Sequence, residues 1–315
     1  MKFKNLKLLV SMSCLILILA ACNEDDAAPR NMGSVQFEIT DAPIDDASVK
    51  SVFVTVADIK VDGQSISGFN KTTIDVLAFQ NGNTSFLADT ELEAKTYTDL
   101  TLVLDFENDE NGDQPGCYVA EEDGSTKHPL FSSSNEISVQ SNFEVISDLE
   151  SKVVVDFDLR KCVQRENKQD DQYEFVSNAE FRSGIRVVTK NETGVVKGKC
   201  NDSVSNSDKI VVYAYKKGEY NRDTETSAQG QSEIEFANAV SSSSVNASGN
   251  FEMHFLEKGD YELVYCSYKE NAQNEMKLEG TLMIGVLGTI NLSSVSVDAA
   301  ATVDVEVNVS GMLPL

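Results

Sequence analysis

Three carboxylates lie close together near the start of the β-rich part of the chain. Asp41, Asp45 and Asp46 could supply oxygen ligands to calcium, a hard cation that carboxylates bind well. The alternative is structural, since Asp41 stands in a Thr-Asp-Ala-Pro sequence in which Asp bonds to nearby backbone and Pro43 fixes φ. We favour the turn, because coordination needs several converging ligands. A weak calcium site stays the alternative.

A second acidic stretch partly fits the EF-hand calcium loop. Glu107, Asp109 and Asn111 occupy ligand positions one, three and five if Gly112 is the glycine at position six. Position twelve then falls on Tyr118, where the pattern requires a bidentate glutamate. We therefore expect an acidic hairpin loop, with weak calcium binding as the alternative. No cofactor other than calcium is suggested.

The chain offers few groups for catalysis. His128 and His254 are its two histidines, so a Ser-His-Asp triad has almost no candidates. The Gly-x-Ser-x-Gly, His-Glu-x-x-His and Gly-x-x-x-x-Gly-Lys motifs are missing as well. A carboxylate pair for hydrolysis of glycosides stays open in a chain with 51 acidic residues, although no spacing selects one. We expect a protein that is not an enzyme.

The charge of the chain excludes one class of partner. It has 51 acidic and 26 basic residues, which gives a formal net charge of −25. Nucleic acids are bound through basic patches, so we expect no nucleic-acid partner. Sugars are commonly stacked on Trp, which the chain lacks. Exposed tyrosines would have to replace it, and the candidates are Tyr213, Tyr215, Tyr220 and Tyr268.

The N-terminus indicates export and attachment to a membrane. Three lysines precede an apolar run at residues 8–19, which is shorter than the ~20 residues that span a bilayer as a helix. Residues 1–21 are therefore expected to be a cleaved signal peptide, with an uncleaved anchor helix as the alternative. Leu-Ala-Ala-Cys, which ends at Cys22, resembles the lipobox of bacterial lipoproteins. The resemblance implies that Cys22 is acylated and anchors the mature protein to the membrane.

Residues 22–32 follow as an acidic tether. Asn-Glu-Asp-Asp at residues 23–26 resembles the acidic tract of surface-exported lipoproteins in Bacteroidota. This resemblance implies the outer membrane and exposure at the cell surface, so we expect a lipid-anchored protein of the bacterial cell envelope.

Four cysteines lie beyond the anchor: Cys117, Cys162, Cys200 and Cys266. In an exported chain an even number of cysteines indicates disulfides, and four cysteines allow three pairings. We expect Cys117 to pair with Cys162 and Cys200 with Cys266, since each bridge then lies within one proposed domain. Zinc is the competing interpretation, but no Cys-x-x-Cys spacing supports it.

Strand patterns dominate the chain from residue 34 onward. Val35, Phe37 and Ile39 alternate with polar neighbours, the period of two that is typical of half-buried strands. Further β-branched and aromatic runs, separated by turn residues, lie at 74–79, 97–106, 136–139, 152–159 and 185–189. Because long helical periodicity is absent, we expect an all-β protein of two antiparallel β-sandwich domains in tandem after the signal peptide.

The first of these domains is expected at residues 33–190. Thr-Asp-Ala-Pro at 40–43, Val-Phe-Val-Thr-Val at 52–56 and Val-Asp-Phe-Asp-Leu at 155–159 resemble an exported family called domain of unknown function 4382. The resemblance implies a β-rich lipoprotein module and no established activity. In the last run we expect Val155 and Phe157 to pack inward, which places Asp156 and Asp158 on a solvated face.

The second domain is expected at residues 191–315. Gly-Val-Val-Lys-Gly opens it at 194–198, and Gly-Asn-Phe at 249–251 precedes Leu-Glu-Lys-Gly-Asp-Tyr-Glu-Leu at 256–263. These motifs resemble the carboxypeptidase regulatory-like (transthyretin-like) β-sandwich family, which implies that Phe251 and Tyr261 pack across a hairpin. A Ser/Asn/Gln-rich insertion at 219–246 departs from the family pattern and is expected to be a mobile loop.

The function favoured by these observations is a membrane-anchored lipoprotein that binds, adheres or supports envelope architecture without catalysis. Its partners would be the membrane, through the lipid on Cys22, and a protein or glycan. The first alternative is a calcium-dependent accessory module that binds carbohydrate or protein, and the second is a hydrolase with an unrecognised carboxylate pair.

Overall fold

The structure is a computed structural model that describes residues 31–42, 49–121, 126–165, 172–271, 276–288 and 291–315. The chain falls into two compact units, Met1–Asn31 and Met32–Leu315, and every described strand belongs to the second. The signal peptide, Cys22, Asp45 and Asp46 lie outside the described residues.

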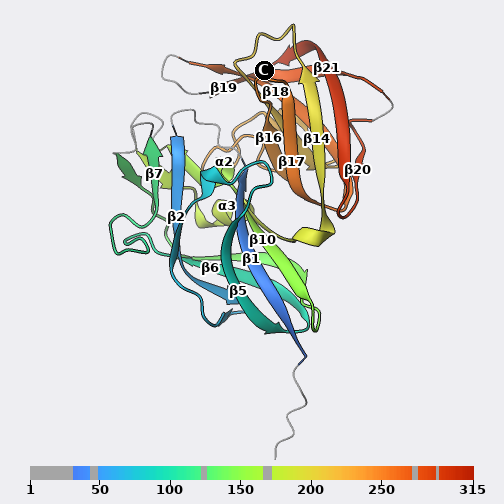
Figure 1. Cartoon of the computed structure of the whole chain (residues 1–315). Helices are drawn as coiled ribbons and strands as arrows, with labels where there is room; N and C mark the ends of the chain where they lie inside the picture. The colour runs from blue at the N-terminus through green and yellow to red at the C-terminus, as the bar shows by residue number, and fades with distance from the viewer. Residues whose placement is uncertain (1–30, 43–48, 122–125, 166–171, 272–275, 289–290) are drawn as a thin grey trace, which may run out of the picture. The chain divides into compact units, whose positions relative to one another are not determined.

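Residues 32–189 form two main sheets. Figure 1 labels β10, β1 and β5, three neighbouring strands of the smaller sheet. The four-stranded sheet has the order β13 (Ile185–Thr189), β10 (Glu150–Asp158), β1 (Met32–Ala42) and β5 (Ser85–Glu93). The seven-stranded sheet has the order β8 (Lys127–Pro129), β7 (Tyr118–Glu121), β2 (Val49–Val61), β6 (Thr96–Leu104) and β9 (Glu136–Glu144). Two short strands also pair with β2, namely β3 (Gln64–Ser65) and β4 (Thr72–Asp75).

The predicted period of two builds the core between these sheets. Val35, Phe37 and Ile39 of β1 are fully buried in one apolar cluster, to which β2, β6, β9 and β10 also contribute. The rings of Phe37 and Phe143 meet edge to face, with centroids 6.1 Å apart. Alternation therefore predicted correctly which face of β1 is apolar.

Short elements connect the strands of this region. A two-stranded ribbon pairs β11 (Val163–Arg165) with β12 (Tyr173–Phe175). Brief helical turns are η1 (Val76–Ala78), α2 (Leu159–Cys162), α3 (Asn178–Ser183) and η3 (Lys190–Glu192). Of these, α2 directly continues β10, so residues 159–162 begin where the strand ends.

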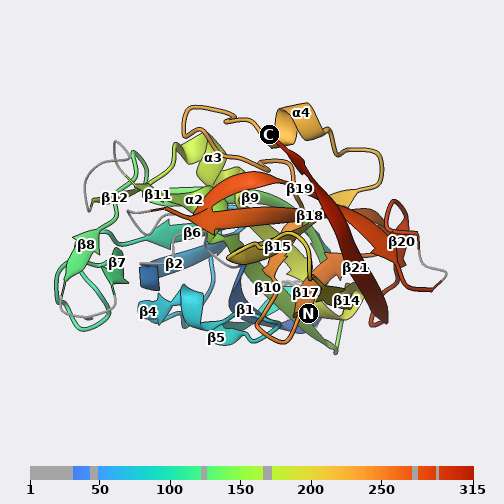
Figure 2. The same ribbon diagram turned by 90° about the horizontal axis from the view of Figure 1, so that it is seen from above.

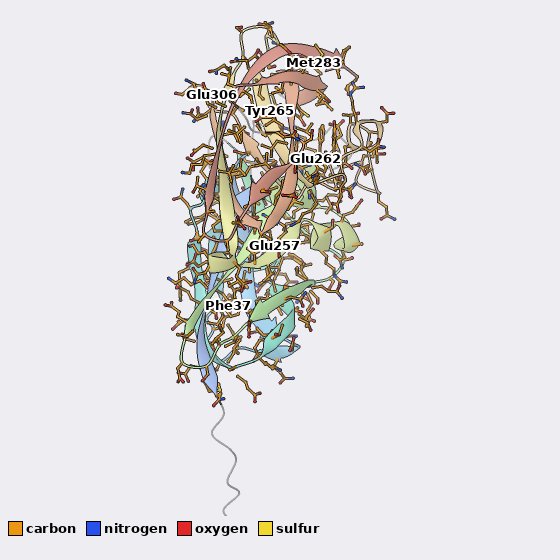
Figure 3. The ribbon with its side chains drawn as sticks, turned by 90° about the vertical axis from the view of Figure 1, so that its right-hand side faces the viewer. Phe37, Glu257, Glu262, Tyr265, Met283 and Glu306 are labelled. Atoms are coloured by element: carbon orange, nitrogen blue, oxygen red, sulfur yellow. The ribbon has the colours of Figure 1, made fainter. Side chains whose placement is uncertain are left out.

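A single sheet contains the strands of residues 193–314. Its order is β16 (Ser241–Ser244), β15 (Lys209–Lys216), β18 (Gly259–Glu270), β19 (Met276–Val286), β21 (Thr302–Pro314), β14 (Thr193–Asn201) and β17 (Asn250–Glu257). A short strand, β20 (Val295–Val297), pairs with β18. The sheet encloses its own apolar cluster, in which Phe251 and Tyr261 are both buried, as expected for the hairpin. Figure 3 shows Tyr265 in this region and Phe37 among the strands of residues 32–189.

The all-β class is confirmed, but the sheets are not purely antiparallel. β1 runs parallel to β10, and β14 runs parallel to β21. β1 and β10 are the two central strands of their sheet, and both faces are buried over residues 37–41 and 153–158, as is usual for parallel strands. Alternation of residue types indicates which face of a strand is buried but not the direction of the strand, so the parallel pairing could not be predicted from it.

The insertion at 219–246 is ordered, contrary to the expected mobile loop. It contains α4 (Arg222–Glu225) and the edge strand β16, and Phe236 is fully buried. Phe236 stacks on Tyr213 of β15 with ring centroids 4.2 Å apart. Figure 2 shows α4 beside the C-terminus of the chain, where Arg222 donates to the carbonyl of Pro314. Tyr213 and Tyr215 are therefore buried beneath this segment and are not exposed sugar platforms.

Within the described part of the chain, none of the helices is both long and apolar enough to cross a bilayer.

Candidate functional site

The outer face of β10 carries charged residues that the sequence predicted to be solvated. Asp156 and Asp158 are only 6% and 7% exposed, so this expectation is wrong. Residues 235–255 of the chain cover that face and supply backbone carbonyl groups to it. Burying carboxylates is costly unless each is paired, and the structure shows basic partners beside both.

We call this set of residues the ionic joint: Asp156, Asp158, Arg160, Lys161 and Arg186. Arg160 Nη2 lies 2.9 Å from Asp158 Oδ2, and Lys161 Nζ lies 3.4 Å from the same oxygen. Arg186 pairs with Asp156. All three ion pairs are short, and the Asp158 and Arg160 side chains are at most 10% exposed.

The bases of the ionic joint also bind the second half of the chain. Arg160 Nη1 donates to the carbonyl of Glu235 at 2.7 Å, and its guanidinium lies over the Tyr213 ring at 5.1 Å. Lys161 donates to the carbonyl of Ala239, and Arg186 donates to that of Phe255. The sheets of residues 32–189 are therefore connected to the 193–314 sheet by charge-assisted hydrogen bonds inside the protein.

An apolar and a charged contact continue this interface beyond the ionic joint. Val154 and Val188 pack against Phe255 in a small buried cluster. Lys190 Nζ lies 2.5 Å from Glu38 Oε2. Burial raises the pKa of Glu38, but hydrogen bonds from Lys190 and Thr84 outweigh it and hold the pKa below its ordinary value.

Asp41 is buried near the end of β1, so it is not an exposed turn residue. Its Oδ1 accepts a hydrogen bond from the Leu159 backbone N–H at 3.3 Å, so Asp41 supports the turn α2 that begins there. Burial, together with the charges of Asp156 and Asp158, raises the pKa of Asp41 well above its ordinary value. Its predicted partners Asp45 and Asp46 lie outside the described residues.

The acidic loop uses its carboxylates to shape itself. Asp109 Oδ1 accepts hydrogen bonds from the backbone N–H groups of Asn111 at 2.8 Å and Asp113 at 2.9 Å. The amide of Asp113 is the leading cause that lowers the pKa of Asp109. Glu107 donates its backbone N–H to Asp105. Across the described residues, no group of three or more His, Cys, Asp or Glu side chains is arranged to hold a metal ion.

The four cysteines are free thiols, so neither predicted disulfide is present. Cys200 belongs to the core enclosed by its sheet, whereas Cys266 belongs to the cluster beneath Phe236 on the opposite face of β18. Cys117 Sγ contacts the backbone of Thr55 and Asp105, while Cys162 Sγ lies near the carbonyl of Phe181. Burial raises the pKa of Cys117 to about 12 and that of Cys200 to about 11, so these thiols are poor nucleophiles.

A cavity beside His254 has the residue types of a hydrolase but not the space. His254 Nε2 lies 2.8 Å from Glu252 Oε2, and the adjoining wall is formed by residues 241–243, all serine. The cavity measures ≈20 Å³, which holds one water molecule and no substrate. Packing is tight here, because a Cβ on Gly82 would lie 2.3 Å from the His254 ring.

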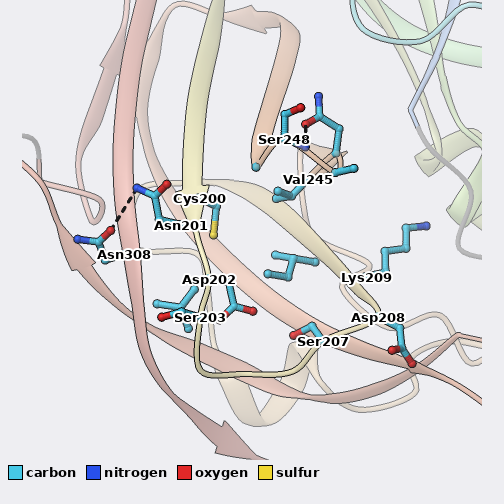
Figure 4. A pocket seen from close by; sticks show the side chains of 15 residues that line it. Cys200, Asn201, Asp202, Ser203, Ser207, Asp208, Lys209, Val245, Ser248 and Asn308 are labelled. Atoms are coloured by element: carbon cyan, nitrogen blue, oxygen red, sulfur yellow. Dashed lines mark hydrogen bonds between the residues drawn. The ribbon is translucent and has the colours of Figure 1, made fainter.

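A much larger depression lies at the opposite end of β14 from η3, and we call it the loop cleft (Figure 4). Its volume is ≈630 Å³, within the range of small-molecule sites. It forms between the end of β14, the middle of β21, the start of β15 and the loop between β16 and β17. Its polar lining includes Asn201, Ser203, Ser207, Asn246, Ser248 and Asn308, and aliphatic lining comes from Ile210, Val245 and Val309.

Hydrogen bonds fix the amides of the loop cleft. Asn201 Nδ2 donates to Asn308 Oδ1 at 3.2 Å. This pair lies at the rim of the loop cleft, on the other side of β14 from Val245 and Ser248 (Figure 4), because Cys200 and Val309 of the same two strands point into the core. Asn246 Oδ1 accepts from the backbone of Ser248 and Asn250, which leaves its Nδ2 as a donor.

The carboxylates that border the loop cleft are occupied elsewhere. Asp202 accepts the backbone N–H groups of Val204 and Ser205, and Asp208 pairs with Lys269 at 2.9 Å. What the loop cleft offers to a ligand is therefore mainly neutral amide and hydroxyl groups above an aliphatic floor.

The sequence singled out Asp156 and Asp158 of the ionic joint, but as solvated residues, and it predicted neither their basic partners nor the loop cleft. Arg160, Lys161 and Arg186 belong to no recognisable motif. Asn201 ends β14, Asn246 lies in the loop after β16 and Asn308 lies within β21, so only the sheet order brings these asparagines together. The sequence offered one signal for the ionic joint, which is the pair of acidic residues at alternate positions of β10, Asp156 and Asp158.

One family model matches the N-terminal part of the described chain. Residues 32–177 match the family model described as "Domain of unknown function (DUF4382)", which confirms the resemblance expected for this segment. A comparison of the chain with curated proteins finds no match.

Solved structures similar to the chain include two pilins and a TIE protein. The TIE protein of Bacillus anthracis is 12% identical, with a TM-score of 0.20, over 88% of this chain and 34% of that protein. This chain thus spans about a third of its length. BcpA, the major pilin subunit of Bacillus cereus, is 8% identical over 89% and 71%, with a TM-score of 0.21. GBS52, the minor pilin of Streptococcus agalactiae, is 13% identical over 89% and 98%, with a TM-score of 0.20. Similarity at this level says nothing of ligand or partner.

Proposed function

We propose that this protein is a non-enzymatic binding module of the bacterial cell envelope, held to the membrane by lipid on Cys22, that takes a neutral glycan in the loop cleft. The observation that carries the proposal is the neutral hydrogen-bonding surface of the loop cleft. The lipid anchor is supported by the apolar run at 8–19 and the Leu-Ala-Ala-Cys sequence.

Hydroxyl-rich ligands need donors and acceptors at short spacing. The amides of Asn201 and Asn308, fixed by their mutual bond, offer one acceptor and one donor at the rim, and Asn246 adds a second donor. An anionic ligand would meet the charges of Asp202 and Asp208, with Lys209 as the one basic side chain that lines the loop cleft. A neutral sugar avoids that repulsion, and its C–H faces fit the aliphatic residues of the floor.

The ionic joint supports a role that transmits load. A protein tethered at one end and bound to a ligand at the other is pulled along its length. Buried ion pairs and the Val154–Phe255 contact connect the sheets of residues 32–189 to the sheet that carries the loop cleft. This continuity suits adhesion, since an interface made only of exposed polar contacts would open more readily.

The test is a calorimetric titration of the protein with neutral gluco-, galacto- and manno-hexasaccharides. We expect saturable binding of at least one of them. Asn201→Ala and Asn308→Ala should each weaken it about five- to tenfold, the consequence of losing a hydrogen bond of ~1 kcal/mol.

The matched control is Asn142→Ala, because Asn142 is exposed on β9, outside the loop cleft. This variant should bind like the parent protein. Equal affinity of all three variants would place the ligand elsewhere, and no binding of any hexasaccharide would reject the glycan proposal.

A further inference from the structure

Two exposed apolar side chains lie on the turn between β9 and β10. Ile146 is 48% exposed and Leu149 is 56% exposed. The turn is well defined, since the Leu149 backbone N–H donates to Ile146 at 3.2 Å and Val145 is buried in the core. The turn therefore holds two large apolar side chains in solvent at one place, a small apolar surface available to a partner.

The same turn lies beside the beginning of the described chain. The Asp148 backbone N–H donates to the carbonyl of Met32 at 3.0 Å, and the Ser34 N–H donates to that of Leu149 at 3.1 Å. Met32 is ten residues from Cys22. A chain of that length spans at most about 35 Å when fully extended. The tether therefore keeps Met32, which lies beside the turn, within about 35 Å of Cys22.

The charges around the turn indicate which lipid surface it fits. Glu144, Asp148 and Glu150 are exposed on the turn and its flanking strands, and Glu93 pairs with Met32 in the adjacent ladder. Lys152 and Lys95 are the nearby bases, so acidic groups predominate. Anionic headgroups would repel these acidic residues, whereas the ammonium groups of phosphatidylethanolamine would attract them.

We infer that the turn 146–149 is a membrane contact, in which Ile146 and Leu149 enter the interfacial region of the zwitterionic bilayer that holds Cys22. The contact orients the body of the protein at the membrane, because a flexible tether alone leaves its orientation free. This inference rests on the lipid anchor of the proposed function.

The experiment uses the full chain, produced with its lipid and reconstituted into phosphatidylethanolamine–phosphatidylcholine vesicles. Ser147→Cys receives an environment-sensitive nitrobenzoxadiazole label, and Ser203→Cys, at the loop cleft, receives the same label as a reference. The four other thiols do not compete for the reagent, since all of them are buried. We expect blue-shifted emission, and quenching by doxyl-labelled lipid, at residue 147 and neither at residue 203.

Two further variants assign the signal to the apolar side chains. Ile146→Ser combined with Leu149→Ser should abolish the blue shift at residue 147. Val204→Ser removes an apolar side chain with the same 56% exposure as Leu149 and should leave the shift unchanged. Vesicles containing phosphatidylglycerol should weaken it.

The outcomes separate the contact from the anchor. A protein that does not float with the vesicles would reject the lipid anchor itself. A protein that floats but shows no blue shift at residue 147, or keeps the shift in the double serine variant, would overturn the membrane contact. A shift that requires phosphatidylglycerol would overturn the assignment to a zwitterionic surface.

Discussion

Arg160 and Asp158 form a buried ion pair, with Nη2 and Oδ2 2.9 Å apart, at the point where β10 passes into α2. The second guanidinium nitrogen of Arg160 binds the Glu235 carbonyl, 75 residues away in the sequence. One side chain therefore neutralises a buried carboxylate and satisfies the backbone of the segment that covers it. This double use makes the ionic joint the main polar link between the two halves of the chain.

Breaking this ion pair should be costly. Arg160→Met leaves Asp158 buried with Lys161 as its remaining partner, and it frees the carbonyl of Glu235. We expect the free energy of unfolding, measured by urea titration, to fall by ~3–5 kcal/mol, as for other buried pairs that lose one member. Arg160→Met combined with Asp158→Leu should recover part of that loss.

The control for this prediction is an exposed ion pair. Lys258 and Asp298 lie 2.9 Å apart, but their side chains are 72% and 68% exposed. Lys258→Met should therefore cost less than about 1 kcal/mol. Equal losses in Arg160→Met and Lys258→Met would show that the ionic joint does not stabilise the interface.

Asp41 should destabilise the protein at neutral pH. Its pKa is raised from the ordinary value of 3.8 by burial and by Asp156 and Asp158, so the folded state holds this proton more tightly than the unfolded chain. The corresponding stability is present below pH 3.8 and is lost as the pH rises through the folded pKa. We expect Asp41→Asn to raise the Tm by about 2–4 °C at pH 7, the equivalent of ~1 kcal/mol, and to bring no gain at pH 3.5.

The pKa of Glu38 is shifted in the opposite direction to that of Asp41. Its pKa is lowered from 4.5, so its contribution to stability is present above that value and is lost as the pH falls through the folded pKa. Glu38→Gln should lower the Tm at pH 7 more than at pH 3.5. A gain for this variant at pH 7, or a gain for Asp41→Asn at pH 3.5, would contradict the assignments.

The thiols should be unreactive in the folded protein. N-ethylmaleimide at pH 7.5 should modify Cys117, Cys162, Cys200 and Cys266 in urea but not in buffer, since all four thiols are buried in the folded protein. Peptide mapping by mass spectrometry under non-reducing conditions checks this residue by residue. Recovery of a Cys200–Cys266 cross-link would contradict the placement of Cys266 on the face of β18 that points away from Cys200.

Calcium should bring no specific stabilisation. The Asp109 carboxylate already accepts two backbone N–H groups, and Lys71 pairs with Asp105 at 2.7 Å. Calcium and magnesium at matched ionic strength should therefore raise the Tm equally, by screening the acidic surface. Asp109→Asn should lower the Tm by the same amount in both ions. A gain confined to calcium, and abolished by this substitution, would favour the calcium-dependent alternative.

The sequence predicted what depends on local pattern. Val35, Phe37 and Ile39 alternate, and they are the buried face of β1, because the strand repeat places alternate side chains on one face. The Thr-Asp-Ala-Pro sequence and the two other motifs predicted the family model that residues 32–177 match. Phe251 and Tyr261 share a core, as the hairpin pattern indicated.

The rest depends on contacts between distant segments, which no local pattern contains. We predicted a solvated face for Asp156 and Asp158 because the segment that covers them lies about 80 residues later in the chain. We predicted a mobile loop for that segment because Phe236 is an isolated aromatic residue among Ser, Asn and Gln. Counting cysteines suggested disulfides, but the strand period puts Cys266 on the face away from Cys200. The loop cleft required the order of β14, β15 and β21 in the sheet.

The most direct test of the loop cleft is chemical-shift mapping of the side-chain amides by NMR during titration with the hexasaccharide that binds best. The account predicts saturable shifts for the Asn201, Asn246 and Asn308 amides, with the Asn142 amide unchanged. Shifts that spare these three amides and appear elsewhere, or no saturable shift with any of the three hexasaccharides, would contradict it.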